Sequence, residues 1–207
     1  MIFKQNDALK LLEIIKARRD VRGNRFIPKA VEDEKLNLIL EAGISAPSVG
    51  YSQPWKFIVI QDTKIKNNIL KNFEDENKKA KEIFKDRDLY KKLKLEGIKE
   101  APINMAMLYE PQGEEVIGMT SMKQMGEYSV VCAIQNMWLM ARSLNIGLGW
   151  VSILDEKKVL DQLEAPQSSN LIAYLCLGYV DKFYDESELK TLGWKDEKKL
   201  SDCVVFK

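Results

Sequence analysis

The chain has 207 residues, and its 32 lysines and arginines nearly balance its 31 aspartates and glutamates, which gives a net charge of +1. This balance excludes the broad positive field with which many proteins attract nucleic acid or anionic membranes, so any basic site must be local. The chain has no histidine, which excludes a Ser-His-Asp triad, a His-ligated zinc site and an imidazole general base, and leaves acid–base chemistry to Asp, Glu, Lys, Tyr or a cofactor.

The first predicted elements are two helices that flank a cluster of arginines. Residues 7–18 place apolar side chains on one face at helical spacing, and residues 32–48 repeat the pattern with acidic residues at their start, which suits the helix dipole. Between them lies RRDVR, Arg18–Arg22, whose guanidinium groups could grip a phosphate. A basic helix C-terminus is also favourable on its own, so the cluster alone favours a structural role.

The next predicted elements are two strands separated by a charged segment. PWKFIVIQ, residues 54–61, and APINMAMLY, residues 101–109, are apolar runs typical of buried strands. Residues 63–100 between them are charged and lysine-rich, which predicts one or two exposed helices that could act as a mobile flap. Charge runs of this kind usually form a solvated face.

The most apolar predicted helix spans residues 122–144. It is apolar around most of its circumference, so it must be covered on nearly all sides, and a partner subunit is one source of cover. Residues 147–154 and 171–180 predict two further core strands, with a short helix between them. Strands alternating with helices indicate an α/β or α+β fold. The polar stretch from Lys182 onward, with its LGW and VVF anchors, predicts a packing arm.

Other features mainly exclude functions. No stretch approaches the roughly 20 apolar residues of a membrane span, and the charged N-terminus is unlike a signal peptide, so we expect a cytoplasmic protein without membrane or nucleic-acid partners. Nucleotide-binding Rossmann and P-loop fingerprints are absent from the sequence. The three cysteines form no CxxC pair, and Cys132 and Cys176 lie in apolar runs where we expect buried, reduced thiols and no metal site.

Several motifs together resemble the FMN-dependent nitroreductase superfamily, nearly from end to end. They are RRDVR, APSVGYSQPWKFIVI, KLEGIKEAPIN, YSVVCAIQNMWLMARSLNIGLGWVSIL and AYLCLGYV. The resemblance implies an α+β fold, a three-layer α/β/α sandwich that forms a domain-swapped homodimer with FMN at the subunit interface. It also implies one domain over residues 1–207, with an exposed charged helical segment at about 63–100 and a C-terminal arm at about 182–207.

Within that superfamily the sequence is most similar to the 5,6-dimethylbenzimidazole synthase branch, the BluB-type flavoproteins. Ordinary nitroreductases usually carry Ser where Asp20 stands, and Asn where Tyr51 stands in the loop before QPW. Loss of that Asn alters a polar flavin contact, and gain of Asp20 adds a carboxylate. Both departures favour this branch.

The resemblance also implies a reaction and a set of site residues. Reduced FMN is the substrate, and dioxygen converts it to 5,6-dimethylbenzimidazole, the lower ligand of vitamin B12. Asp20 is the implied acid/base and Ser152 the polar partner that orients the flavin or its peroxide. The implied flavin contacts are Arg18, Arg19, Asp20, Val21, Arg22, Ser48, Gln53, Leu95 and Ser152. Because Asp20 lies among arginines, we expect a lowered pKa and an ionised carboxylate, and a role as acid would need partial burial.

Two alternatives stay open at this point. FMN could be a recycled cofactor for NAD(P)H-dependent reduction of nitro compounds, quinones or similar acceptors, or the chain could bind flavin without catalysis. If the chain is a synthase, a separate flavin reductase would supply the reduced flavin. Residues 110–125 carry no family motif and could form part of the pocket rim.

Overall fold

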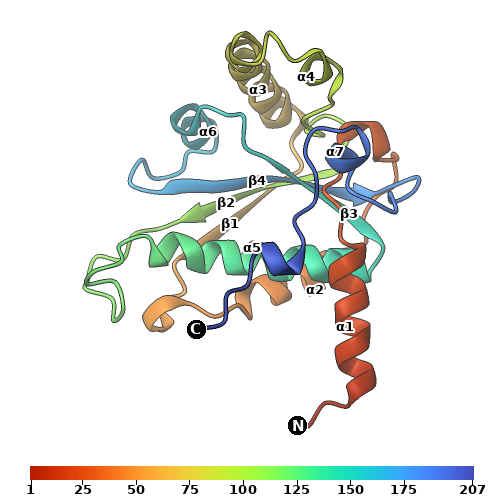
Figure 1. The fold of residues 1–207 in the computed structure, drawn as a ribbon. Coiled ribbons are helices and arrows are strands. Elements are labelled where there is room, and N and C mark those ends of the chain that lie inside the picture. The colour runs from red at the N-terminus through yellow and green to blue at the C-terminus, as the bar shows by residue number, and fades with distance from the viewer.

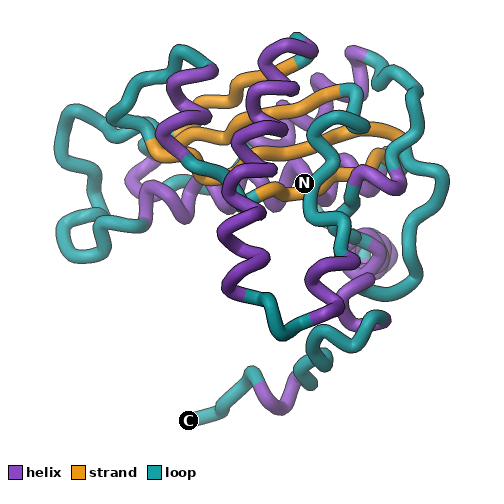
Figure 2. The backbone as a smooth tube through the Cα atoms, turned by 90° about the horizontal axis from the view of Figure 1, so that it is seen from above, coloured by secondary structure: helices purple, strands orange, loops and turns teal.

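The computed structural model describes all 207 residues and contains one four-stranded antiparallel sheet with helices on both faces (Figure 1). The strand order is β1 (Trp55–Ile60), β2 (Ile103–Tyr109), β4 (Asn170–Tyr179) and β3 (Ile146–Val151). Figure 2 shows the four strands side by side in one layer. All four predicted strands are confirmed, but β3 ends before Ser152.

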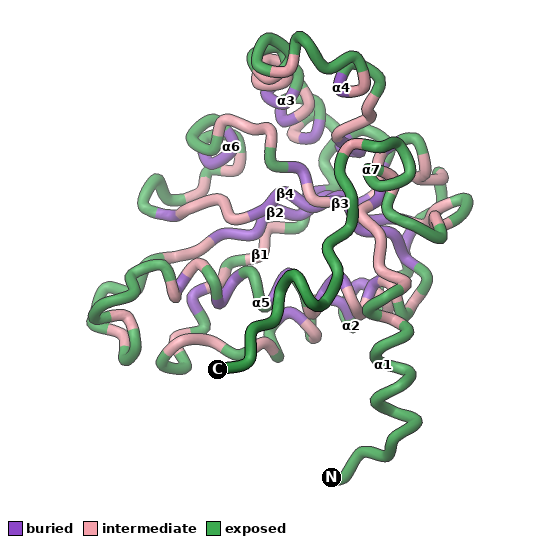
Figure 3. Tube along the Cα trace, viewed as in Figure 1, coloured by how far each residue is buried: buried purple, intermediate pink, exposed green.

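Two helices cover each face of the sheet, which makes three layers. On one face α2 (Asp33–Ile44) and α5 (Met125–Ser143) pack against the sheet, around a core that includes Ile39, Met137 and Leu175. On the other face α3 (Thr63–Ile83) and α6 (Glu156–Gln162) enclose a second core that includes Ile69, Phe73 and Tyr174. Because both faces are covered, the central strands are buried along nearly their whole length (Figure 3). The predicted three-layer α+β fold is confirmed.

Helix α1 (Gln5–Ala17) extends away from this body and has no buried residue (Figures 1 and 3). Its C-terminal end contacts α5, but most of its length projects beyond the sheet. The apolar face predicted from the sequence is present, yet Leu9, Leu11, Leu12 and Ile15 remain 42–52% exposed. Nothing in this chain covers that face.

Helix α5 is less completely covered than its sequence suggested. It packs on α2 and the sheet along one side, where Ile134, Met137 and Ala141 are fully buried. The opposite side is open, so Cys132 is exposed, and the prediction that it is a buried thiol is wrong. Cys176 on β4 is buried as predicted. None of the helices is both long and apolar enough to cross a membrane.

The charged segment and the C-terminal arm contact each other beside the sheet. After α3 the chain forms α4 (Asp88–Lys92), and the arm forms α7 (Glu188–Thr191). The Trp194 ring packs at 5.8 Å from Phe84 and 6.3 Å from Tyr90, between ring centroids. This aromatic contact fixes the arm to the α3–α4 segment. Three single-turn 3-10 helices complete the chain, at Gly23–Arg25, Val49–Tyr51 and Leu200–Asp202.

Candidate functional site

The RRDVR segment leaves the end of α1 and runs directly beside β3. The Val21 N–H donates to the Leu148 carbonyl oxygen at 3.1 Å, and Asp20 forms a parallel bridge with Leu148. Glycine at position 149 permits this approach, because a Cβ atom there would lie 2.0 Å from the Val21 carbonyl oxygen. Val21 is thereby buried at 5% exposure. The backbone of the segment is fixed to the core of the protein.

Contacts from both sides hold the Asp20 carboxylate in place. Its Oδ1 accepts a hydrogen bond from the Trp150 backbone N–H at 3.0 Å, and its Oδ2 pairs with the Arg22 guanidinium. Arg22 in turn donates to the Trp150 carbonyl oxygen at 2.9 Å. The three residues form a closed ring of contacts, so neither the carboxylate nor the guanidinium can move without breaking it.

The pKa of the Asp20 carboxyl is raised, contrary to the expectation from its arginine neighbours. Burial is the largest cause and favours the neutral acid, while the Arg22 charge, the Trp150 N–H and the Arg18 charge act in the opposite direction. About a third of the side-chain surface, 33%, is still accessible, and Asp20 lines a cavity. A carboxyl in this setting holds a proton more readily than an exposed aspartate, which suits a group that both accepts and returns one.

A cavity of about 680 Å³ lies over this segment. Its volume is within the range of about 300–1,000 Å³ that is typical of small-molecule sites. Five of the residues predicted to contact flavin line it together: Arg18, Arg19, Asp20, Arg22 and Leu95. The arm supplies the opposite wall. The structure therefore brings the arginine cluster, the unusual carboxylate and the Leu95 segment into one site.

Two of the arginines in the cavity have no carboxylate partner. The Arg19 guanidinium donates to carbonyl oxygens, at 2.7 Å to both Lys16 and Arg18 and also to Asp185, and its Nε is buried without a partner. The Arg18 guanidinium lies over the Trp138 ring, 4.7 Å from the centroid. Two guanidinium groups without a salt bridge at one wall of a cavity suit an anionic group such as a phosphate.

Ser48 and Gln53 lie elsewhere in the chain. The Val49 N–H next to Ser48 donates to the Ser129 hydroxyl at 3.1 Å, near the start of α5. The arginine segment meets α5 at Trp138, nine residues further along, which is about 13 Å at the α-helical rise. Neither Ser48 nor Gln53 lines the large cavity. Their roles as flavin contacts stay predictions.

The turn that carries these two residues has an unusual backbone. Gly50, Tyr51 and Gln53 all have positive φ angles, of 54°, 55° and 47°. Left-handed backbone at non-glycine residues persists only where the surrounding structure imposes it, and it occurs often at ligand sites. Ser152 is exposed just beyond β3 and also lies outside the cavity lining, so its catalytic role stays a prediction.

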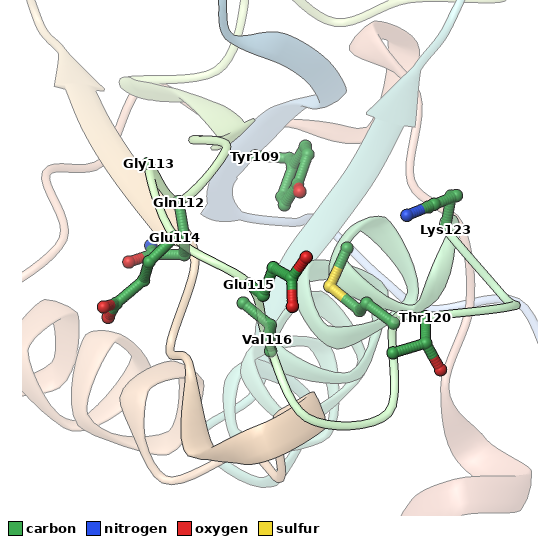
Figure 4. Close-up of a pocket in the computed structure, with 9 residues that line it drawn as sticks. Tyr109, Gln112, Gly113, Glu114, Glu115, Val116, Thr120 and Lys123 are labelled. Atoms are coloured by element: carbon green, nitrogen blue, oxygen red, sulfur yellow. The ribbon is translucent and has the colours of Figure 1, made fainter.

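A second cavity, of about 550 Å³, is formed by the loop that follows β2 (Figure 4). Tyr109 and Glu115 point toward its middle, with Lys123 on the side opposite Gln112. The loop packs against the strained turn, because a Cβ atom at Gly50 would lie 2.7 Å from the Ile117 carbonyl oxygen. The loop at 110–125 therefore lies next to the turn that carries Ser48 and Gln53, and it does not line the cavity that contains the arginines.

Some site residues had no signal in the sequence. Trp138 contacts the arginine segment through both its ring and its indole N–H, yet its spacing on α5 is that of an ordinary core residue. The arm was predicted, but not its place over the cavity. Its contribution to the lining is mainly acidic: Asp185, Glu186, Glu188, Asp196 and Glu197.

Comparisons with known proteins show the family and the fold. The nitroreductase family model matches residues 15–179. A 5,6-dimethylbenzimidazole synthase of Rhodospirillum rubrum is 36% identical over 185 residues, covering 87% of each chain, and one of Rhodobacter capsulatus is 33% identical over 201 residues, covering 95% of this chain and 96% of that protein. The crystal structure of iodotyrosine deiodinase bound to FMN and 3-iodo-L-tyrosine superimposes with a TM-score of 0.68 at 24% identity, covering 84% of this chain and 91% of that one. At that identity the likeness shows the fold alone.

Proposed function

The chain belongs to the nitroreductase family, and from that membership we propose that it is a 5,6-dimethylbenzimidazole synthase, which fragments reduced FMN with dioxygen. Relatives with that name match it over most of both lengths. The structural observation that carries the proposal is the Asp20 carboxyl, held by Trp150 and Arg22 in the wall of the arginine-lined cavity.

The residues of the cavity fit FMN. Arg18 and Arg19 would bind its phosphate, since their charges lack carboxylate partners, and Arg22 would meet the polar edge of the ring. Leu95 offers an apolar wall, while Val21 is buried behind the segment and would support it from the core. The proposed flavin contacts also include Ser48, Gln53 and Ser152, which lie outside the cavity of the single chain.

When bound and reduced, FMN supplies the atoms of the product and the electrons that dioxygen accepts. The residues of the chain would transfer protons and limit the access of water. Asp20 accepts a proton at a carboxylate oxygen and returns it, and its raised pKa makes both steps accessible. Trp150 and Arg22 fix the direction of the carboxyl group. The arm forms one wall of the cavity, which would limit the access of water to the reacting atoms from that side. Ser152 would orient the flavin from the end of β3.

We further propose that the active form is a homodimer of a single 207-residue domain. The apolar face of α1 has no cover within the chain. The predicted contacts Ser48 and Gln53 lie apart from the arginines, and a partner subunit could bring its own copies to the cavity. A cytoplasmic location fits the three free cysteines.

The test is to incubate the protein with chemically reduced FMN in air and to analyse the products by mass spectrometry. We expect 5,6-dimethylbenzimidazole from the parent, and FMN binding without this product from Asp20→Ser. The matched control is Asp181→Ser, because Asp181 also pairs with an arginine, Arg25 at 3.0 Å, but lies outside the cavity. The control variant should retain product formation.

Two outcomes would overturn the proposal. If the parent yields only oxidised FMN, the chain is no synthase, and rapid bleaching of bound FMN by NADH or NADPH would then identify an NAD(P)H-dependent reductase. Tight FMN binding with neither reaction would identify a flavin-binding protein without catalysis. If Asp20→Ser forms product at an undiminished rate, the acid/base role of Asp20 is wrong.

A further inference from the structure

Two tryptophans bracket the arginine segment, one from α5 and one from β3. The indole N–H of Trp138 donates to the Arg19 carbonyl oxygen at 3.1 Å, and its ring carries the Arg18 guanidinium at 4.7 Å from the centroid. Trp150 holds the next residues of the segment through its backbone. The two rings lie 6.4 Å apart at an angle of 47°. The segment is therefore held by side-chain contacts on one side and backbone contacts on the other.

Trp138 is one of two residues of α5 that receive the end of α1. Arg142 lies one turn further along the same face of α5, and its Nε donates to the Ala17 carbonyl oxygen at 2.9 Å. The last carbonyl groups of an α-helix have no partner within the helix. Arg142 supplies such a donor to Ala17, and Trp138 supplies one to Arg19 just beyond the helix, so α5 fixes the position where α1 ends and the arginines begin.

We propose that Trp138 is a positioning residue that holds Arg18 and Arg19 in the arrangement that binds the phosphate of FMN. This inference rests on the proposed function, since it assumes that the cavity takes a flavin nucleotide. Trp138 is not a catalytic residue, because it acts only through the two arginines.

The Trp138 ring is the direct support of Arg18. The Arg18 guanidinium stacks on that ring and makes no salt bridge, although its charge also acts on the nearby Asp20 carboxyl. A guanidinium stacked on an aromatic face keeps its N–H groups free at the edge. That arrangement leaves the donors available for an anion in the cavity, which Arg18 lines.

The support for Trp138 comes from the core. It is 9% exposed, and its neighbours Met137 and Ala141 on α5 are fully buried. By contrast, α1, from which the arginines emerge, has no buried residue. In the contact between Trp138 and the two arginines, the indole is therefore held rigidly by the core, and without it the arginine side chains would be free to move.

The experiment measures the contribution of the phosphate to flavin binding. Dissociation constants for FMN and for riboflavin, which lacks the phosphate, are obtained by quenching of flavin fluorescence for the parent, Trp138→Phe, Trp138→Leu and the control Trp55→Phe. Trp55 lies on β1, where it stacks on Phe57 away from the cavity. The ratio of the riboflavin constant to the FMN constant reports the phosphate contacts alone.

We expect Trp138→Leu to reduce this ratio by about tenfold, on the order of a partly desolvated cation–π contact, while riboflavin affinity changes less than about twofold. Trp138→Phe keeps a smaller aromatic face and loses the indole N–H, so it should rescue most of the ratio. The control should leave the ratio unchanged. In an Arg18→Gln background, Trp138→Phe and Trp138→Leu should give the same ratio, because the guanidinium group that stacks on the aromatic ring is absent from both.

Four results would overturn the inference. One is an unchanged ratio in Trp138→Leu, and another is an equal loss of FMN and riboflavin affinity, which would indicate a purely structural role. If Trp138→Leu does not fold, Trp138→Phe is compared with Trp138→Phe that also carries Arg18→Gln. Equal ratios of the riboflavin constant to the FMN constant in these two variants would overturn the inference. A parent that binds FMN no more tightly than riboflavin also refutes it, whereas a parent that binds neither flavin refutes the proposed function itself.

Discussion

Gly149→Ala should destabilise the protein and displace Asp20, although the substitution adds only one methyl group. A Cβ atom at position 149 would lie 2.0 Å from the Val21 carbonyl oxygen, whereas ordinary contact begins at 3.4 Å. The obstructing atom is backbone, which no side-chain rotation can remove. The segment and β3 would therefore have to separate by about 1.4 Å, the difference between these two distances.

That separation would break two hydrogen bonds between the segment and β3. They are the bond from the Val21 N–H to the Leu148 carbonyl, at 3.1 Å, and the bond from the Trp150 N–H to Asp20, at 3.0 Å. An added separation of about 1.4 Å would take both beyond the upper limit of normal N–H···O distances, about 3.2 Å. A neutral hydrogen bond contributes about 0.5–1.5 kcal/mol and one to a charged group about 1.5–3 kcal/mol, so we expect a loss of about 2–4 kcal/mol.

The assay is urea unfolding of the flavin-free protein, followed by circular dichroism at one fixed protein concentration. The matched control is Gly113→Ala, where an added Cβ atom meets nothing within 4 Å. The control should lie within about 0.5 kcal/mol of the parent, as exposed substitutions usually do. A loss below about 1 kcal/mol for Gly149→Ala, or an equal loss in the control, would refute the conclusion that this close approach holds Asp20 in place.

Tyr179→Phe should raise the pKa of Glu32 from about 2, because the phenol O–H, which donates to Glu32 at 2.5 Å, is the largest cause of the lowered value. Because the pKa of Glu32 is lowered, the carboxylate stabilises the fold above its ordinary carboxyl pKa, and this stabilisation is lost as the pH falls through about 2. An unchanged pKa of Glu32 in a carbon-13 NMR titration of Tyr179→Phe would contradict this assignment. Trp194→Ala should release the C-terminal arm from its aromatic contact, so trypsin should cleave the arm sooner than in Trp194→Phe. Equal cleavage rates would show that the ring does not fix the arm. The Cys176 thiol, whose pKa burial raises, should react with a thiol reagent only on unfolding, whereas the exposed Cys132 and Cys203 should react in the native protein. Fast native labelling of the peptide that contains Cys176 would exclude its buried position.

The sequence by itself determined the secondary structure and the family. The strands at Trp55–Ile60 and Ile103–Tyr109 are continuous apolar runs, and α3 shows helical periodicity despite its many charges. These properties are local, because the periodicity of apolar residues and the residue types depend only on nearby positions in the sequence. The motif RRDVR and the presence of Asp20 likewise needed no structure to identify the candidate site.

The tertiary structure decided how those residues behave. Sequence neighbours predicted a lowered pKa for Asp20, but the pKa is raised, because burial of the carboxylate beside β3, about 130 residues away in the chain, outweighs the lowering effects of Arg22, the Trp150 N–H and Arg18. Cys132 is exposed although its run is apolar, because α5 packs along one side only. Burial and electric environment depend on contacts between distant segments, and a sequence pattern contains no record of which segments meet.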